Sequence, residues 1–390
     1  MAVYISSNSN RFYCATETTY GQVPVVTEMN RIPTVKLIAK QQLEVTNRKD
    51  KTGSRTFAGL PPGGRRKTIF DLSTLLTSWT GQSSGPSYGP LFQAALGGGP
   101  VSFAGGTLAT GSAGTTLVFA APHGLTTGQA VTYLGELRFV AAIANNLSIL
   151  VNAPFSVNPA AGGIIGPAVT YFPSTELPSV SVFDYWSPSS AVHRILCGAG
   201  VSRLVVKLNG DYHEFQFSGV AQDLADSSSF SSGVGQLSSF PLEPVLGSFD
   251  YSVVPGHIGQ IWLGNTPSQF FTLTSAELTV DNNLDVRGRE FGSSLPRAIS
   301  PGTRSVSIDF ELYEQDDTAT QGLYQAARQQ SPISIMLQLG QQPGQLFGTY
   351  LKSVLPEVPE YDDADKRLKW HFRSSRAQGT VDDELAMAFG

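Results

Sequence analysis

The sequence predicts a mainly β protein: two repeated antiparallel β-sandwich domains, each with a flanking α-helix, and a small inserted β-domain. Three observations lead to this fold class. The chain has 390 residues, 41% of them hydrophobic and only 15% charged, and its 40 glycines and 24 prolines are typical of a protein with many turns. Several segments alternate apolar and polar side chains with the period of a strand. One ordered series of such segments occurs twice.

The internal repeat is clearest between residues 21–47 and 256–282, which align without a gap at an offset of 256 − 21 = 235. In both copies the same order follows: a strand, a glycine-containing loop, a Leu-Pro pair, a second strand and an alanine-rich helix start. Near the repeat ends, residues 221–222 match 377–378, and the offset has fallen to 377 − 221 = 156. The first repeat therefore carries roughly 80 extra residues.

The extra residues lie between two Gly/Pro/Ala-rich segments, LGGGP and PAAGGIIGPA, and contain short strand-like runs separated by turn signals. Such flanks predict an independent β-module that is decoupled from the repeats and can be deleted without loss of assembly. The expected division of the chain is 1–97 and 172–222 for the first repeat, 98–171 for the inserted module, 223–255 for a serine-rich linker and 256–390 for the second repeat.

Strands are predicted where the period of two is regular. Residues 39–46, 275–281 and 305–312 each place apolar side chains on one face and polar ones on the other, so each has one face in a core and one in water. Asn209-Gly210 lies between two such runs and predicts a β-hairpin with a type I′ turn. Residues 318–330 predict the best helix, with Asp317 or Thr318 as its N-cap.

Motifs for chemistry are absent from the sequence. There is no G-x-S-x-G, H-E-x-x-H or Walker A pattern, the five histidines lack ligand spacing, and residues 281–292 lack the glycine and glutamate of a calcium loop. Cys14 and Cys197 are too few for a disulfide scaffold. We therefore expect no enzyme, no cofactor, and no catalytic, cofactor-binding or metal site.

Charge and hydropathy exclude two further classes. The net charge of −5 argues against a protein that clamps nucleic acid by its phosphates. No apolar stretch is long enough to span a membrane, and the N-terminus lacks the features of a signal peptide, so no membrane insertion is expected.

The second half of the chain carries an ordered pattern: FTLTSAELTVDNNLDVRG, GTRSVSIDFELY, the helix GLYQAARQQ, then PISIMLQLG, GTYLKSVLPEVPEYDDADKRLKWHFRSS and GTVDDELAMAF. This pattern resembles the tail tube proteins of long-tailed, siphovirus-like bacteriophages. The segment PSVSVFDYW to RLVVKLNGDYHEFQFSGVAQD of the first repeat resembles the same family. The resemblance covers about 300 residues and leaves out the insertion.

The resemblance implies a structural virion protein. Members fold as a β-sandwich flanked by a helix, six domains form a ring whose inner strands close into a β-barrel, and stacked rings form the tube that ejects double-stranded DNA. This chain carries two such domains, so three chains would form a trimeric, pseudo-hexameric ring, with a hexamer of chains left open. The implied partners are the tape measure, tail terminator and tail tip proteins, in a virion tail assembled in the host cytoplasm.

Two sets of residues are expected to serve this role. The alternation places a mostly acidic set on the polar face, which we expect to point into the lumen and to let DNA slide without sticking. Two long loops, 48–65 and 283–303, exceed what a hairpin needs and are expected to contact neighbouring rings or chains. The lumen set is Glu44, Asp71, Glu277, Asp281, Asp309 and Glu311, and the loop set is Arg55, Arg65, Arg66, Arg287 and Arg289.

Two other readings stay open at this point. A tail-tip or adhesin-type virion protein would bind host surface glycans through the inserted module, with Trp79, Tyr88 and Trp186 as weak aromatic candidates. A β-sandwich hydrolase would need a polar constellation, which the sequence does not display. The polar face itself is also compatible with an ordinary solvent-exposed sheet.

Overall fold

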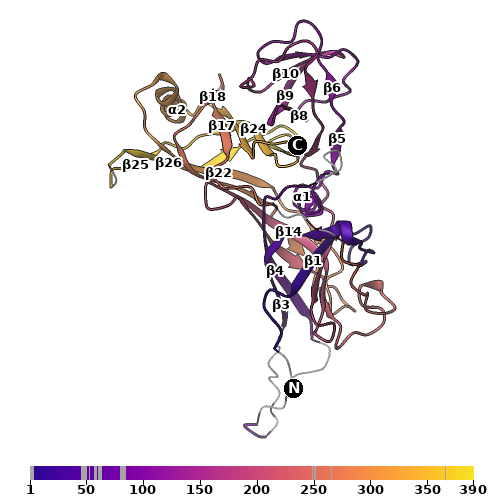
Figure 1. Ribbon diagram of the computed structural model, residues 1–390. Helices are drawn as coiled ribbons and strands as arrows, with labels where there is room; N and C mark the ends of the chain where they lie inside the picture. The colour runs from indigo at the N-terminus through magenta and orange to yellow at the C-terminus, as the bar shows by residue number, and fades with distance from the viewer. Residues whose placement is uncertain are drawn as a thin grey trace.

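The computed structural model confirms a mainly β fold, with 46% of residues in strands and 7% in helices. Figure 1 shows the two repeats, joined near helix α1, and the inserted module beside the C-terminal strands. The structure describes residues 4–44, 51, 53–56, 59, 64–79, 85–247, 249, 252–264, 266–364 and 366–390.

The first repeat alternates strands and loops around one short helix, and the linker that follows it adds one strand. Its elements are β1 (Asn10–Thr16), η1 (Glu28–Asn30), β2 (Arg31–Ile32), β3 (Thr34–Leu43), β4 (Arg66–Leu75), α1 (Gly89–Leu96), β13 (Val180–Trp186), β14 (Arg194–Leu208), β15 (Glu214–Ala221), β16 (Asp223–Asp226) and η2 (Val234–Gln236).

The inserted segment contains only short strands, apart from β9. These are β5 (Val101–Phe103), β6 (Gly106–Thr107), β7 (Thr116–Val118), β8 (Ala130–Tyr133), β9 (Glu136–Asn145), β10 (Ser148–Val151), β11 (Ile164–Ile165) and β12 (Ala168–Tyr171).

The second repeat has a longer helix and ends in a buried strand. Its elements are β17 (Gly259–Leu263), β18 (Ser268–Gln269), β19 (Leu273–Asp281), β20 (Asp285–Val286), β21 (Ile299–Ser300), β22 (Ser305–Tyr313), α2 (Thr318–Gln329), β23 (Ile333–Leu339), β24 (Phe347–Leu355), β25 (Glu360–Asp362), β26 (Lys369–Ala377) and β27 (Ala386–Phe389).

The strands of the two repeats pair in the same order. In the first repeat the order is β3, β4, β15, β14, β13, β1. In the second it is β19, β22, β26, β24, β23, β17. Helices α1 and α2 each follow the second strand of their series. The exact domain boundaries stay a prediction.

The strand register corrects the sequence alignment of the repeats. Lys36 pairs with Ser73, and Ser275 pairs with Glu311, directly after a β-bulge in each hairpin. The bulges therefore align Lys36 with Ser275, at an offset of 275 − 36 = 239 instead of 235. The difference is four residues, an even number, so both offsets place the described side chains on the same face. Val45 and Thr46 of the predicted strand lie outside the described residues.

The repeats are joined edge to edge through β14 and β19, which pair antiparallel from Arg203–Asp281 to Leu208–Ala276. The pairing makes one continuous sheet in the order β3, β4, β15, β14, β19, β22, β26, β25. In the described part of the chain, β3 pairs only with β4 and β25 only with β26. The sheet therefore has two open edges.

Local signals in the sequence agree with the structure to different extents. Asp317 caps α2, where its carboxylate accepts a hydrogen bond from the backbone N–H of Thr320 at 2.7 Å. The hairpin predicted at Asn209-Gly210 is present between β14 and β15. Its turn is not type I′, because Asn209 has a left-handed φ of 60° whereas Gly210 does not.

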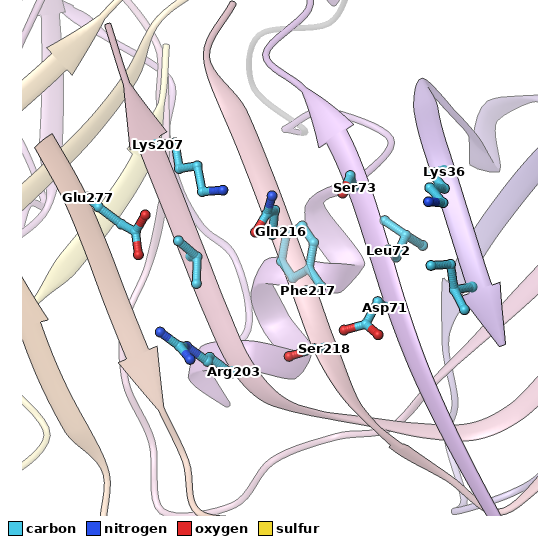
Figure 2. Close-up of a pocket in the computed structure, with 12 residues that line it drawn as sticks. Lys36, Asp71, Leu72, Ser73, Arg203, Lys207, Gln216, Phe217, Ser218 and Glu277 are labelled. Atoms are coloured by element: carbon cyan, nitrogen blue, oxygen red, sulfur yellow. The ribbon is translucent and has the colours of Figure 1, made fainter. Parts of the chain in front are cut away.

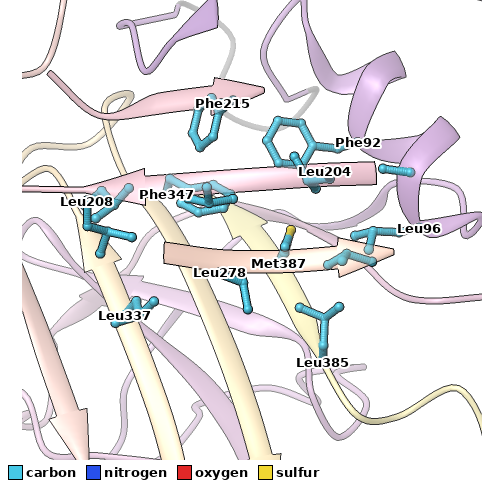
Figure 3. Packing of buried hydrophobic residues seen from close by; sticks show 14 of the residues in the cluster. Phe92, Leu96, Leu204, Leu208, Phe215, Leu278, Leu337, Phe347, Leu385 and Met387 are labelled. Carbon is cyan, nitrogen blue, oxygen red and sulfur yellow. The ribbon is translucent and has the colours of Figure 1, made fainter. Parts of the chain in front are cut away.

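One hydrophobic core extends through both repeats, and Phe92 of α1 lies at its centre. Figure 3 shows Phe92 among side chains from both repeats. Its ring packs within 5.1 to 6.3 Å, centroid to centroid, of six other aromatic rings: Tyr88, Tyr171, Phe215, Phe217, Phe347 and Phe389. Helix α1 therefore connects the cores of the two repeats.

The inserted module has its own small core but is not decoupled, contrary to the expectation from its flanks. Strand β12 pairs with β27 of the second repeat, and Leu137 and Phe139 pack with Trp262 and Met336 in a shared apolar cluster. Clean deletion of 98–171 would uncover this cluster. The Gly/Pro-rich flanks form turns that lead the chain into these contacts, so they do not separate the module from the repeats.

Arg138 fastens the module to the second repeat. Its side chain is fully buried and donates hydrogen bonds to Gln338 and Gln260 of the second repeat, both at 3.0 Å, and the guanidinium lies over the Trp262 ring. Glu136 lies 3.3 Å from it. Burial lowers the pKa of Arg138 to about 10, so the group remains charged near neutral pH.

The structure also places the two cysteines and the helices of the chain. Cys14 and Cys197 are free thiols buried in the first repeat. Among the described residues, neither helix is long and apolar enough to cross a membrane.

Replacing Phe92 with Ala tests the central packing. Loss of a fully buried phenyl ring should lower the free energy of unfolding by about 3–5 kcal/mol. The control is Phe271→Ala, at a ring that is 84% exposed, which should change it by about 0.5 kcal/mol or less. Urea unfolding measures both, and similar values for the two variants would contradict the central role of Phe92.

Replacing Arg138 with Ala tests the attachment of the module. Glu136 would lose its buried partner, so stability should fall by about 3–5 kcal/mol. Limited proteolysis should then cut within 98–171 earlier than in the wild type. Arg328→Ala, on the exposed side of α2, is the matched control. Unchanged protease resistance in the Arg138 variant would show that the module is held by other contacts.

Candidate functional site

A hollow on the polar face of the continuous sheet spans the junction of the two repeats. It has a volume of about 450 Å³ and crosses five adjacent strands, β3, β4, β15, β14 and β19. Figure 2 shows its polar side chains projecting from neighbouring strands toward the same side. The lining includes Lys36, Asp71, Ser73, Arg203, Lys207, Gln216, Ser218 and Glu277.

The period of two in the strands produces this face. In β22, Val306, Ile308, Phe310 and Leu312 are buried, so the residues between them face away from the core. In β4 the same holds, with Phe70 and Leu72 buried on either side of the exposed Asp71. The strand register then brings these outward positions of neighbouring strands next to one another.

All six acidic residues expected on the polar face lie on the side away from the core. Asp71, Glu277, Asp281, Asp309 and Glu311 alternate with buried apolar residues, and Glu44 is exposed directly after β3. Whether they face a lumen stays a prediction.

The charge of this face is mixed, whereas the alternation in the sequence predicted a mostly acidic face. Within the register, Lys207 lies opposite Glu277, and Arg203 lies opposite Asp281. Lys36 adds a further positive charge from β3. The period of two in β14 indicates that Arg203 and Lys207 point to the same side of the strand. Only the pairing of β14 with β19 shows that this side is the polar face with the acidic residues.

Glu311 is the most firmly held acidic residue of the set. It accepts a hydrogen bond from the Thr274 hydroxyl at 2.7 Å, and it lies 3.5 Å from Lys369 Nζ and 3.3 Å from His371 Nδ1. Its side chain is 20% exposed. Asp309 accepts a hydrogen bond from the backbone N–H of Ser374. These two carboxylates therefore stabilise the sheet as well as charging its surface.

The arginines of the two long loops bring parts of these loops together within one chain. Arg65 donates a hydrogen bond to the carbonyl of Arg289 at 3.3 Å, and the N–H of Arg66 bonds to the carbonyl of Ser294 at 2.9 Å. Arg287 forms an ion pair with Glu290. Arg55 is exposed, and most of the loop 48–65 lies outside the described residues. Contacts of these arginines with another chain stay a prediction.

The loop 283–303 forms a small arm of its own. Strands β20 and β21 pair within it, and near its tip the Phe291 side chain is fully exposed. Asn282, at the base of the arm, is buried and donates hydrogen bonds to the carbonyls of Ala95 and Val201. The second residue of the segment 281–292, which was compared with a calcium loop, is thus a structural amide.

Nothing in the described geometry points to a reaction centre. No group of three or more His, Cys, Asp or Glu side chains that could hold a metal ion occurs among the described residues. The two cysteines have pKa values raised far above the ordinary range, chiefly by burial, which makes them poor nucleophiles.

A family model described as phage tail tube protein matches residues 7–368. The chain belongs to the phage tail tube protein family. It is therefore a structural protein of the virion tail, and the match extends over most of both repeats but leaves out β26 and β27. No curated protein matches the chain.

The environments of Glu311 and Glu277 predict different responses to charge reversal. Glu311→Lys would lose the Thr274 bond and face Lys369 and His371, so it should lower the free energy of unfolding by about 1–3 kcal/mol. Glu277→Lys should cost about 1 kcal/mol or less, from repulsion by Lys207 across the strand pair. Urea unfolding of the two variants checks this. Equal losses would contradict the structural role of Glu311.

Proposed function

We propose that three copies of this chain form a ring, and that stacked rings form the tail tube through which double-stranded DNA is ejected. The observation that supports this most directly is the continuous sheet of both repeats, whose two ends are open edges. Unpaired edges are a liability in a free sheet, and closure into a barrel removes them. The repeats already pair edge to edge inside one chain, so the same type of contact between chains would close the ring.

The polar face is proposed to line the channel. The opposite face carries the apolar core with α1, which cannot be exposed to an aqueous lumen. On the proposed lumen side, Lys207 and Arg203 lie opposite Glu277 and Asp281, so neighbouring charges compensate each other. A surface of compensated charges offers DNA phosphates no basic patch to bind, which suits a conduit. This modifies the expectation of a collectively negative wall.

The exposed arm around Phe291 is proposed to contact the next ring. An exposed aromatic ring on a loop is typical of a binding anchor, and the arm extends from the junction of β19 and β22. The tape measure, tail terminator and tail tip proteins are further proposed partners, in a virion tail assembled in the host cytoplasm.

The glycan-binding alternative receives no support from the inserted module. Residues 98–171 are all described, and their six aromatic residues are all buried, so the module presents no exposed aromatic platform. These residues are Phe103, Phe119, Tyr133, Phe139, Phe155 and Tyr171.

Assembly of the purified chain tests the proposal. Native mass spectrometry should detect a complex of three chains, and negative-stain electron microscopy should show rings with pseudo-sixfold symmetry and stacks of them. The proposal is contradicted if the chain stays monomeric across the accessible concentration range, or if the complexes contain six chains.

Phe291→Ser tests the contact between rings. The substitution removes an exposed phenyl group, which contributes to binding only where another surface covers it. If the next ring of chains covers this group, tubes should become shorter or absent while three-chain complexes persist. Phe271→Ser, another exposed phenylalanine, is the control. Tubes of normal length in the Phe291 variant would assign the stacking contact to another part of the chain.

A further inference from the structure

The two open edges of the sheet carry opposite charge. Figure 1 shows β3 and β25 at well-separated ends of the molecule. On the polar face, β3 presents Lys36 and Lys40, whereas β25 presents Glu360 and Asp362. Within the described part of the chain, neither lysine has an ion-pair partner. Glu360 lies 3.0 Å from Arg373, and Asp362 lies 3.5 Å from His371.

Both edges also expose apolar side chains that a partner strand would cover. On β3 these are Val35 and Leu43, at 62% and 58% exposed, and at the other edge Tyr361 is 58% exposed. Apolar groups on an unpaired edge favour the addition of another strand. The exposed apolar side chains therefore favour pairing of each edge with another strand. The opposite charges determine which edge that strand can belong to.

The pairing of β14 with β19 inside the chain is a template for a pairing between two chains. In the first repeat, Val205 and Lys207 of β14 pair with Gln216 and Glu214 of β15. In the second repeat, Glu360 and Asp362 of β25 pair with His371 and Lys369 of β26. Since β15 and β26 hold the same place in the strand order, β25 corresponds to the end of β14. Glu360 then corresponds to Val205, and Asp362 to Lys207.

The other side of the junction can be mapped in the same way. The shared bulge aligns β3 with β19 at the offset of 239, so Lys40 corresponds to Thr279 and Ile38 to Glu277. Val205 pairs with Thr279 within the chain. The equivalent pair between two chains is Glu360 with Lys40. Asp362 then lies opposite Ile38, diagonally between Lys36 and Lys40.

We propose that β25 of one copy pairs antiparallel with β3 of a second copy in this register, and that the reversed charge polarity of the two junctions selects this contact. Within a chain, the β14 edge is basic and the β19 edge acidic. Between chains, the β25 edge is acidic and the β3 edge basic. This register adds detail to the ring proposed above, and the inference rests on that proposed ring.

The polarity also disfavours the wrong contacts. Two β3 edges would bring lysines together, and two β25 edges would bring carboxylates together, so both symmetric dimers are repelled. The permitted contact is head to tail, which generates closed rings when the rotation fits. The charges thus favour a ring over a symmetric dimer before any contact with other tail proteins.

Charge-reversed variants test the proposal. The first variant is Lys36→Glu with Lys40→Glu, the second is Glu360→Lys with Asp362→Lys, and the third combines all four substitutions. Each of the first two should weaken association by about tenfold or more at low salt, with partial recovery at high salt because screening reduces repulsion. The combined variant should assemble like the wild type. Arg328→Glu, on the exposed side of α2, controls for net charge.

A mixture of the first two variants gives a sharper result. Each should be monomeric alone, and together they should form open complexes in which the two variants alternate, because both edges of one variant complement the edges of the other. A three-chain ring of these two variants must contain one like-charge junction, so closed rings should remain rare in native mass spectra.

The possible outcomes separate the two proposals. If the wild type forms three-chain rings and either charge-reversed variant assembles equally well, the charge selection is wrong while the ring stands. If the combined variant has wild-type urea unfolding but does not assemble, the register is wrong. If the wild type forms no rings, the proposed function itself fails.

Discussion

The pairing of β14 with β19 is the contact on which the rest of the structure depends. It fuses two repeats that each bury one face of a sheet into a single layer with one core side and one polar side. A slip of one residue in this pairing would reverse every side chain of one repeat relative to the other. The buried amide of Asn282, bonded to Ala95 and Val201, holds the end of this junction.

The core behind the junction explains why the insertion cannot be a free appendage. Phe92 packs against Phe215 of the first repeat and against Phe347 and Phe389 of the second. Phe389 lies on β27, and β27 lies between β24 and β12. The last strand of the insertion therefore extends the sheet of the second repeat, and Arg138 is buried where β9 packs against residues of β17 and β23.

Sequence reasoning succeeded where the information is local. The alternation of β4, β19 and β22 assigned their faces, and Asp317 marked the start of α2. It failed where the information is in the pairing of distant segments. The repeat offset, the placement of Arg203 and Lys207 beside the acidic strand, and the docking of Arg138 all depend on which strands become neighbours, and no local pattern specifies that.

Duplication followed by divergence accounts for the arrangement of charges. Six identical domains would have six equivalent head-to-tail junctions, and one edge of every domain would need to complement the opposite edge of its neighbour. Here the equivalent positions differ: Lys207 corresponds to Asp362, and Ile38 to Glu277. Each repeat keeps the strand order of the other but presents different charges at its edges. In the proposed ring, the pseudo-sixfold arrangement of folds would have threefold chemistry, because one junction is built into the chain and only the other must be recognised between chains.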